Sequence, residues 1–269
     1  EQLAVGPVAH FCQGFEEDLE HLFPQREAIR ATYRRPLPAL VVAPHLGARL
    51  RAEFGRDSVL SPAPIDSSAG RRFRLGPRGR PWIALCGIFE APVKGIRTGL
   101  EVLSALTAAR PAGRAPRLLR ISALPLSEPE AALFPAERYL SAVAPEVALA
   151  ALAQCDLMLF VSTAGEGFGL PLLEAMHLGV PAVASRLPGS EWMVGPGGAR
   201  LVDAGDVDGF QREASSLLDS PSAWRAQRRA GRHAARRFAP DRVGGEVERA
   251  VRWAIERAAE TRRDEVRGA

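Results

Sequence analysis

Residues 156–185 constrain the fold of this chain more than any other segment. They read DLMLFVSTAGEGFGLPLLEAMHLGVPAVAS, with an apolar run over 157–161, a glycine-rich turn, a helical pattern and a second apolar run. Apolar runs without polar alternation are typical of strands that are covered on both faces of a parallel sheet. The segment therefore predicts a strand, a turn, a helix and a second strand of an α/β fold.

The turn inside this segment has the features of an anion site. Gly167 and Gly169 let the backbone approach a ligand without a clash of Cβ atoms, and Pro171 suits the first turn of a helix. The free N–H groups near Gly169 and Leu170, together with the positive end of the helix dipole, favour a phosphate group.

Two carboxylates flank the same turn. Glu166 lies within it, and Glu174 follows eight residues later in the first helical turns. Because a carboxylate repels a phosphate, we expect both to accept hydrogen bonds from hydroxyl groups. The predicted ligand thus carries phosphates and diols, as a nucleotide sugar does. The alternative is a solvated loop followed by a surface helix.

The stretch EGFGLPLLEA, from Glu166 to Glu174, is an E-x7-E signature and resembles the retaining GT-B glycosyltransferases typified by the GT4 family. GVPAVAS, GARLVDAGD and a helix into LLDSP follow in the order of that family's C-terminal domain, so the resemblance covers residues 81–240. It implies that Glu166 contacts the donor sugar and Glu174 the ribose. It also implies that the donor diphosphate is held by the backbone of Gly167, Phe168, Gly169 and Leu170.

Lys94 stands out because it is the only lysine among 35 basic residues. It precedes Gly95 and follows a predicted strand that ends at Gly87, which indicates a place where a compact ammonium is needed and a guanidinium would not serve. A Lys-Gly pair is typical of the resembled family here, with the lysine on the donor diphosphate. The resemblance thus implies donor contacts at Gly87 and Lys94, and we assign catalytic roles to Lys94 and Glu166. The alternative is an exposed lysine kept by chance.

The chain departs from the family pattern at one point. An arginine often follows the strand glycine there as a second cation for the diphosphate, whereas Ile88 follows it here. Arg97 is a candidate substitute, although a residue on the predicted helix 95–109 is more often a solvated charge.

Strand and helix patterns alternate along the whole chain and predict an α/β fold of GT-B type, with two Rossmann-like, doubly wound parallel-sheet domains. Residues 1–68 hold three short strand patterns and are interpreted as the C-terminal part of an acceptor-side domain. An Arg-rich linker is predicted over 69–80, a nucleotide-sugar domain over 81–240, and a C-terminal helix over 241–269 that returns toward the first domain. The predicted strands are 8–12, 39–43, 58–61, 83–87, 118–123, 141–143, 157–161, 182–184 and 199–202.

Three strands are about half of a Rossmann domain. This predicts a fragment, omitted residues or an unusual protein with an incomplete first domain. The segment Gln13 to Glu16, in the form QGFE, has a weak likeness to some rhamnosyltransferases, so Gln13 and Glu16 are candidate acceptor-side residues. The alternative is a pair of solvated loop side chains.

Charge and composition limit which binding partners and which cellular location we expect. The 35 basic residues are set against 31 acidic ones, which gives a net charge of only +4. No apolar run of about 18 residues and no basic-then-apolar start are present, and three scattered cysteines fit a reducing cytoplasm. The predicted helix 223–237 is strongly basic, and Trp224 near its start is its one Phe, Trp or Tyr, so aromatics are not interleaved with the arginines. It favours either a solvated surface or peripheral contact with anionic lipid at the inner face of the membrane, and not nucleic acid.

These patterns lead to one function and two alternatives. The sequence is interpreted as a hexosyl- or rhamnosyl-type enzyme that moves a sugar, with retention, from a nucleotide diphosphate sugar to a glycan or lipid-linked acceptor. Such a reaction belongs to polysaccharide or glycoconjugate biosynthesis. Because the sequence has no cluster of histidine and cysteine residues with metal-ligand spacing, we expect no metal and no other cofactor. The alternatives are a non-catalytic nucleotide-sugar binding protein and, less favoured, a sugar-nucleotide epimerase.

Overall fold

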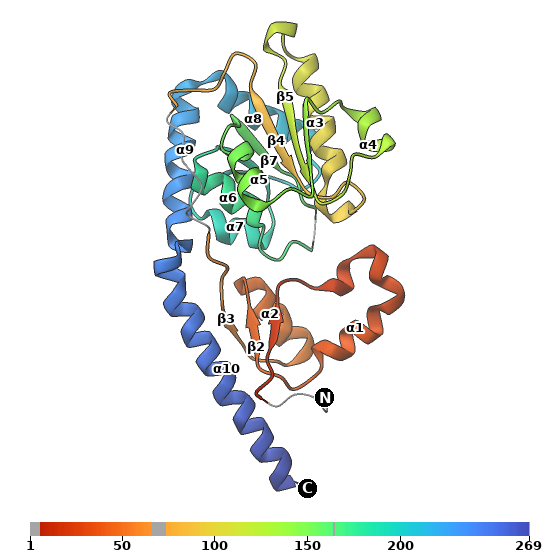
Figure 1. Cartoon of the computed structure of the whole chain (residues 1–269), viewed down its shortest axis with the longest axis vertical. Helices are drawn as coiled ribbons and strands as arrows, with labels where there is room; N and C mark the ends of the chain where they lie inside the picture. The colour runs from red at the N-terminus through yellow and green to blue at the C-terminus, as the bar shows by residue number, and fades with distance from the viewer. Residues whose placement is uncertain (1–5, 66–73, 164, 269) are drawn as a thin grey trace. The chain divides into compact units, whose positions relative to one another are not determined.

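The computed structural model describes residues 6–65, 74–163 and 165–268, with side chains up to Glu260 (Figure 1). The chain divides into two compact units. The larger unit is Ile65–Arg237, and the smaller unit combines Glu1–Pro64 with Phe238–Ala269. Each unit is built on a parallel sheet of its own.

The larger unit has a six-stranded sheet with the order β6-β5-β4-β7-β8-β9. The chain adds β5 and β6 on one side of β4 and then β7, β8 and β9 on the other, so the order reverses between β4 and β7. Ligands of open α/β sheets bind beyond the carboxyl ends of the strands at such a reversal. The strands are β4 (Trp82–Cys86), β5 (Arg117–Ser122), β6 (Arg138–Ser141), β7 (Leu157–Phe160), β8 (Ala182–Ser185) and β9 (Arg200–Val202).

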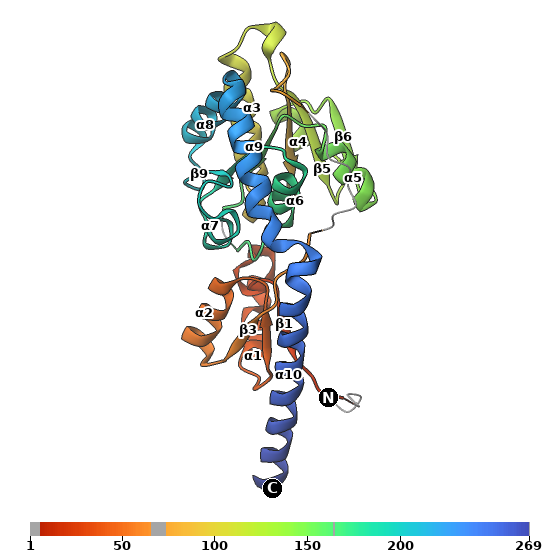
Figure 2. The ribbon, with the colours of Figure 1, turned by 90° about the vertical axis from the view of Figure 1, so that its left-hand side faces the viewer.

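Helices cover this sheet and bury its apolar strands. On one face, α3 and α8 lie side by side (Figure 2), and their apolar stripes enclose Ile83, Leu85, Leu118 and Leu157 in one core. The elements between the strands are η3 (Pro92–Lys94), α3 (Ile96–Ala108), η4 (Ala112–Arg114), α4 (Glu128–Leu133), α5 (Pro145–Leu152), α6 (Leu170–Leu178) and α7 (Pro188–Val194). After β9 come α8 (Val207–Asp219), α9 (Pro221–Ala235) and η5 (Arg236–Phe238).

Fully buried Asp156, just before β7, binds the Arg-rich segment to the larger unit. Its carboxylate accepts from Arg74, from Arg78 Nη1 at 2.9 Å and from the backbone N–H of Trp82 at 2.8 Å. A buried carboxylate is stable only when cations and N–H groups satisfy it. In the predicted linker over 69–80, residues 69–73 lie outside the described residues. From Arg74 onward the segment is attached to the larger unit rather than free.

Helix α9 corrects one expectation. The arginines of this helix and its C-cap recur at three- and four-residue spacing but do not form one solvated stripe; the set is Arg225, Arg228, Arg229, Arg232 and Arg236. Arg228 is buried and donates to the Arg74 carbonyl at 3.1 Å, and Arg225 donates to the Leu75 carbonyl at 2.7 Å. Gly179, at the end of α6, leaves space for this packing, because a Cβ there would lie 3.0 Å from Arg228 Nε. Arg229 and Arg236 are the exposed members of the set.

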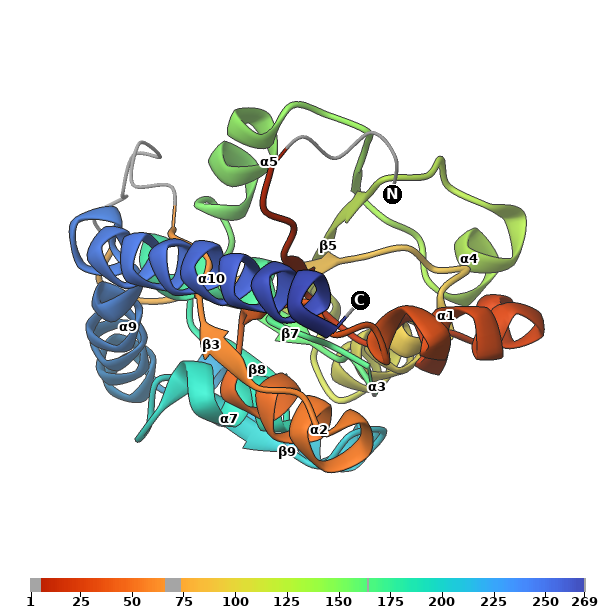
Figure 3. The same cartoon turned by 90° about the horizontal axis from the view of Figure 1, so that it is seen from below.

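The smaller unit has a three-stranded parallel sheet with the order β1-β2-β3. Helix α10 lies along β3 (Figure 3), where Ala250, Trp253 and Ala254 pack with Leu40 of β2 and Val59 of β3. The elements are β1 (His10–Cys12), η1 (Glu16–Asp18), η2 (Glu20–Gln25), α1 (Arg26–Tyr33), β2 (Ala39–Val41), α2 (Pro44–Phe54), β3 (Ser58–Leu60) and α10 (Pro240–Gly268).

Candidate functional site

The predicted site residues of the larger unit lie on two loops at the carboxyl ends of β4 and β7, the strands between which the sheet order reverses. The loops are joined through their backbones, since the Thr163 N–H donates to the Val93 carbonyl at 2.9 Å. Gly95 has a φ of 61°, and a Cβ on it would lie 1.9 Å from the Val161 carbonyl oxygen. Only glycine allows this approach, which explains the Lys-Gly pair.

Lys94 and Glu166 meet between these loops. Lys94 Nζ lies 2.8 Å from Glu166 Oε2, and Ser162 Oγ donates to the same oxygen at 3.0 Å. The two charged side chains are 37% and 16% exposed, so solvent reaches the pair. Gly87, with a φ of 137°, borders the lysine, because a Cβ on it would lie 3.3 Å from Lys94 Cβ. The structure therefore brings three of the predicted residues together.

The start of α6 presents backbone donors beside this ion pair. Gly169 caps the helix with a φ of 86°, and its carbonyl accepts from the N–H groups of Leu172 and Leu173. Within the described part of the chain, the N–H groups of Gly169 and Leu170 have no hydrogen-bond partner. These groups and the positive end of the helix dipole can receive an anion.

Phe168 and Leu170 differ in their surroundings although both belong to the predicted turn. Phe168 is buried and packs edge-on against Trp192 of α7, with ring centroids 6.1 Å apart, which anchors the turn. Leu170 is 43% exposed in the first turn of α6. Gly167, between Glu166 and Phe168, is buried.

Glu174 lies on the second turn of α6, and its charge affects the thiol of Cys86 at the end of β4. Burial raises the pKa of the Cys86 thiol to about 12, and the negative charge of Glu174 contributes to that shift. Both glutamates of the E-x7-E signature thus follow the carboxyl end of β7, Glu166 in the loop and Glu174 on α6.

Arg120 on β5 was not among the predicted site residues. It is 1% exposed, and its guanidinium donates to Glu130 Oε1, to the Leu85 carbonyl at 2.8 Å and to the Gly87 carbonyl at 3.0 Å. An arginine inside the apolar pattern RLLRIS is the signal that indicates it. Arg120 fixes the backbone of Gly87. Its positive charge is matched by Glu130, so it does not replace the missing second cation.

Arg97 does not fill that role in the structure either. It is exposed on α3 and lies over the ring of Phe89, with 5.6 Å between the guanidinium carbon and the ring centroid. The solvated alternative therefore describes this side chain better than a phosphate contact.

Gln13 and Glu16 belong to the smaller unit, after β1. Gln13 is exposed. The Tyr33 hydroxyl donates to the Glu16 carboxylate, and its oxygen accepts from the backbone N–H of Glu16 at 3.3 Å. The next residue, Glu17, is buried and forms ion pairs with Arg30 at 2.7 Å and with other arginines. These contacts fix the segment, and its acceptor-side role stays a prediction.

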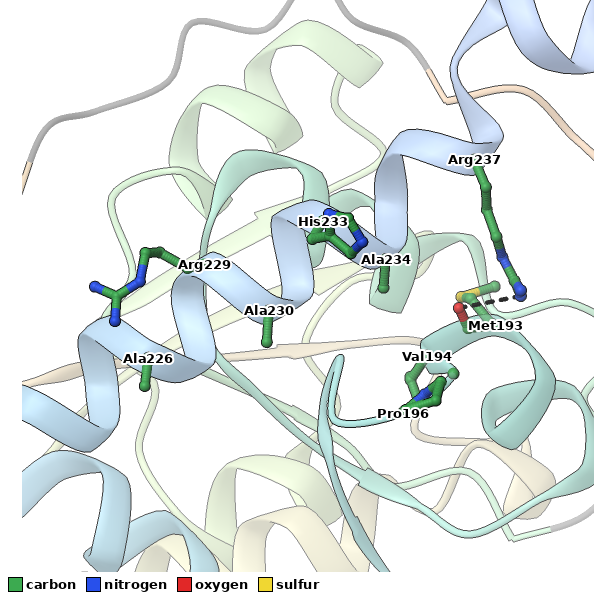
Figure 4. A pocket seen from close by; sticks show the side chains of 10 residues that line it. Met193, Val194, Pro196, Ala226, Arg229, Ala230, His233, Ala234 and Arg237 are labelled. Atoms are coloured by element: carbon green, nitrogen blue, oxygen red, sulfur yellow. Dashed lines mark hydrogen bonds between the residues drawn. The ribbon is translucent and has the colours of Figure 1, made fainter.

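A separate cavity of about 550 Å³ lies between the end of α7 and α9 (Figure 4). Ala226, Ala230 and Ala234 of α9 line it, opposite Val194 and Pro196. At one end, Arg237 donates to the Met193 carbonyl at 3.3 Å. It contains none of the predicted site residues.

Two further observations concern metals and membranes. Among the described residues, no three histidine, cysteine, aspartate or glutamate side chains are grouped so that they could hold a metal ion. The described helices include none with the length and apolar character needed to cross a membrane.

Comparisons with known proteins agree with this architecture. A family model described as glycosyl transferases group 1 matches residues 80–220. Over 91 residues the chain is 44% identical to the MMP alpha-(1->4)-mannosyltransferase of Mycolicibacterium hassiacum, which is 33% of this chain and 21% of that protein. The chain therefore spans only about a fifth of this curated relative in the match.

Two solved structures resemble most of the chain. Sucrose-phosphate synthase from Thermosynechococcus elongatus has a TM-score of 0.73 at 18% identity, over 94% of this chain and 69% of that one. A mutant of S. aureus TarM in complex with fondaparinux, alpha-GlcNAc-glycerol and UDP has a TM-score of 0.64 at 13% identity, over 78% of this chain and 42% of that one. At these identities the likeness shows the fold, and the GT-B fold predicted from the sequence is confirmed.

Proposed function

The chain belongs to the family of glycosyl transferases group 1, and on this premise we propose that it transfers a sugar from a nucleotide diphosphate sugar to an acceptor with retention of configuration. One observation carries the proposal. The ammonium group of Lys94 lies at the reversal of the sheet order, 2.8 Å from Glu166. The N–H groups at the start of α6, which have no partner among the described residues, follow β7 at the same reversal.

The reaction needs positive charge where the leaving group forms. As the anomeric carbon gains oxocarbenium character, the departing diphosphate gains negative charge. Lys94 and the N–H groups of Gly169 and Leu170 stabilise that charge. We therefore propose that turnover requires no divalent metal and no other cofactor, because the protein itself supplies the cations and dipoles.

The ion pair also suggests how the donor is bound. In the structure Lys94 is paired with Glu166, and a diphosphate offers the lysine more negative charge than one carboxylate does. Binding of the donor diphosphate to Lys94 thus breaks the ion pair with Glu166. The Glu166 carboxylate then accepts hydrogen bonds from hydroxyls of the donor sugar. Glu174 accepts from the ribose in the same way.

The sugar and the acceptor are proposed from the comparisons and from the smaller unit. The Mycolicibacterium relative is named as a mannosyltransferase, and the TarM structure contains UDP, which favours a hexosyl donor on a nucleoside diphosphate. We assign acceptor contacts to Gln13 and Glu16, and a glycan or lipid-linked acceptor. In this proposal the enzyme works in the cytoplasm, where exposed Arg229 and Arg236 can contact anionic lipid at the membrane surface.

The proposal is tested with UDP-, GDP-, dTDP- and ADP-sugars. A thermal-shift panel identifies the donor, since a ligand that binds only the native state raises the melting temperature. The selected donor is then incubated with an acceptor extract, with and without EDTA, and the anomeric configuration of the product is determined by NMR. Donor binding without transfer or hydrolysis would favour a non-catalytic binding protein. Loss of turnover in EDTA that Mg²⁺ or Mn²⁺ restores would contradict the metal-independent mechanism.

A further inference from the structure

The smaller unit contains a cavity of about 420 Å³ at the amino ends of β2 and β3. Pro38 and Asp57, which directly precede these two strands, line it, and Trp253 and Arg257 of α10 close one side. This edge is opposite to the carboxyl end of β1, after which Gln13 and Glu16 follow. The cavity is therefore separate from the predicted acceptor-side residues.

Arg56 lines this cavity and is only 7% exposed. Its Nη1 donates to the Tyr33 carbonyl at 2.9 Å and lies 3.1 Å from His10 Nδ1, and its Nη2 donates to the Leu37 carbonyl. Its Nε is buried without a hydrogen-bond partner. Among the described residues no carboxylate pairs with it, and burial lowers its pKa. A buried guanidinium without an anion is costly, so an anionic ligand would stabilise it.

The rim of the cavity carries two more guanidinium groups, each paired with a carboxylate, since Arg34 lies 3.6 Å from Glu27 and Arg257 lies 2.9 Å from Glu260. Arg34 and Arg257 line it together with two acidic side chains. Both carboxylates are already engaged, since Asp57 pairs with Arg51 at 2.7 Å and Glu260 pairs with Arg257 at 2.9 Å. The carboxylates therefore leave the charge of Arg56 unmatched.

Trp253 gives the cavity a flat apolar surface. Its side chain is partly buried against the small core of Leu40, Ala250 and Ala254, and it also lines the cavity. An aromatic face beside guanidinium groups suits a molecule that carries both a ring and an oxyanion.

We propose that this cavity binds a small phosphorylated molecule, with the phosphoryl group near Arg56 and Arg34 and its ring against Trp253. Guanidinium groups form strong, charge-assisted hydrogen bonds with phosphate oxygens. The site is independent of sugar transfer, because it uses no residue of the Lys94 and Glu166 loops.

Calorimetric titration of the full chain with phenyl phosphate tests the proposal, with inorganic phosphate and uncharged benzyl alcohol alongside. We expect phenyl phosphate to bind more tightly than inorganic phosphate, and benzyl alcohol to bind at least tenfold more weakly than phenyl phosphate. Arg34→Gln and Arg56→Lys should each weaken phenyl phosphate binding about tenfold. Trp253→Phe should leave inorganic phosphate binding unchanged.

Lys94→Ala is the matched control, since the start of α6 is a second place where phenyl phosphate can bind. If Lys94→Ala abolishes binding while Arg34→Gln and Arg56→Lys do not, the proposal is overturned. It is overturned as well if wild-type protein binds no phenyl phosphate. Arg56 also holds two carbonyls in place, so circular dichroism checks the fold of Arg56→Lys. Exposed Arg34 keeps the test decisive if Arg56→Lys does not fold.

Discussion

Two ion pairs lie beside Gly87 at the carboxyl end of β4, and they differ in burial and in the groups around them. The side chains of Arg120 and Glu130 are 1% and 2% exposed, and Arg120 also donates to two backbone carbonyls. The side chains of Lys94 and Glu166 are 37% and 16% exposed, and the lysine has Glu166 as its partner. The first pair is part of the packed interior, whereas water reaches the second.

This difference separates a structural pair from a functional one. Breaking the buried pair leaves a charge that neither water nor another side chain can satisfy. Breaking the exposed pair costs little, so a ligand can replace one partner. A similar contrast holds between the units, because Arg120 has a carboxylate partner while Arg56 of the smaller unit has none among the described residues.

The largest predicted effect is on stability. Arg120→Leu leaves Glu130 buried without its cation and removes the donors to the carbonyls of Leu85 and Gly87. We expect the free energy of unfolding of the larger unit to fall by about 3–5 kcal/mol. Differential scanning calorimetry, with urea unfolding followed by circular dichroism, measures it.

Two variants make this test specific. The double variant Arg120→Leu with Glu130→Leu should recover much of the loss, because no charge stays buried. Arg117→Leu, on the same strand, is the single-site control and should cost less. Equal losses for Arg117→Leu and Arg120→Leu would show that the buried ion pair is not the cause of the lower free energy of unfolding.

The second prediction concerns nucleotide binding. Glu174→Ala should weaken binding of the donor's nucleoside diphosphate by about 1.5–3 kcal/mol, because a charge-assisted hydrogen bond to the ribose is lost. Glu166→Ala should instead mainly weaken recognition of the sugar. Isothermal titration with the free diphosphate and with the nucleotide sugar distinguishes them.

Exposed Glu101 on α3 provides the control for overall charge, since Glu101→Ala also removes one carboxylate from the larger unit. Wild-type affinity of Glu174→Ala for the diphosphate would refute the ribose assignment. Full loss of folding in either variant would place that glutamate with the structural pair.

The contrast also explains how much the sequence could predict. The nine predicted strands agree with the observed ones within a few residues at each end, because apolar runs between glycine and proline mark buried parallel strands clearly. The local sequence carries this information. The sequence placed Lys94 and Glu166 in one donor site, but it did not predict their ion pair.

Contacts between distant segments were not predictable in the same way. No local pattern pairs Arg120 with Glu130, and the predicted linker over 69–80 does not indicate that Arg74 and Arg78 bind the buried Asp156. A periodic basic pattern likewise does not reveal that Arg228 packs against α6. Burial of a charged group depends on which partner the fold brings to it.

The third prediction concerns the exposed pair. Lys94→Ala should change the free energy of unfolding by less than about 1 kcal/mol, since solvent-exposed ion pairs contribute little. The same variant should bind the nucleoside diphosphate more weakly, and Lys94→Arg should also lose affinity because a planar guanidinium does not reproduce the compact ammonium that lies 2.8 Å from Glu166. Thermal unfolding and calorimetric titration of one preparation measure both. A large loss of stability with unchanged affinity would show that the pair of Lys94 and Glu166 is structural and does not bind the ligand.

The smallest predicted effect is a pKa shift at Cys86, whose thiol is affected by the charges of both Glu174 and Arg120. Burial raises the pKa of its thiol to about 12, the charge of Glu174 raises it further and the charge of Arg120 lowers it. Glu174→Ala should therefore lower this pKa and Arg120→Leu should raise it. Because only the thiolate reacts, the rate of alkylation by iodoacetamide should rise at a lower pH in Glu174→Ala than in the parent protein. Replacing Cys12 and Cys155 by serine leaves one thiol to follow. An unchanged pH profile in Glu174→Ala would mean that its carboxylate does not face the end of β4, and would remove Glu174 from the site.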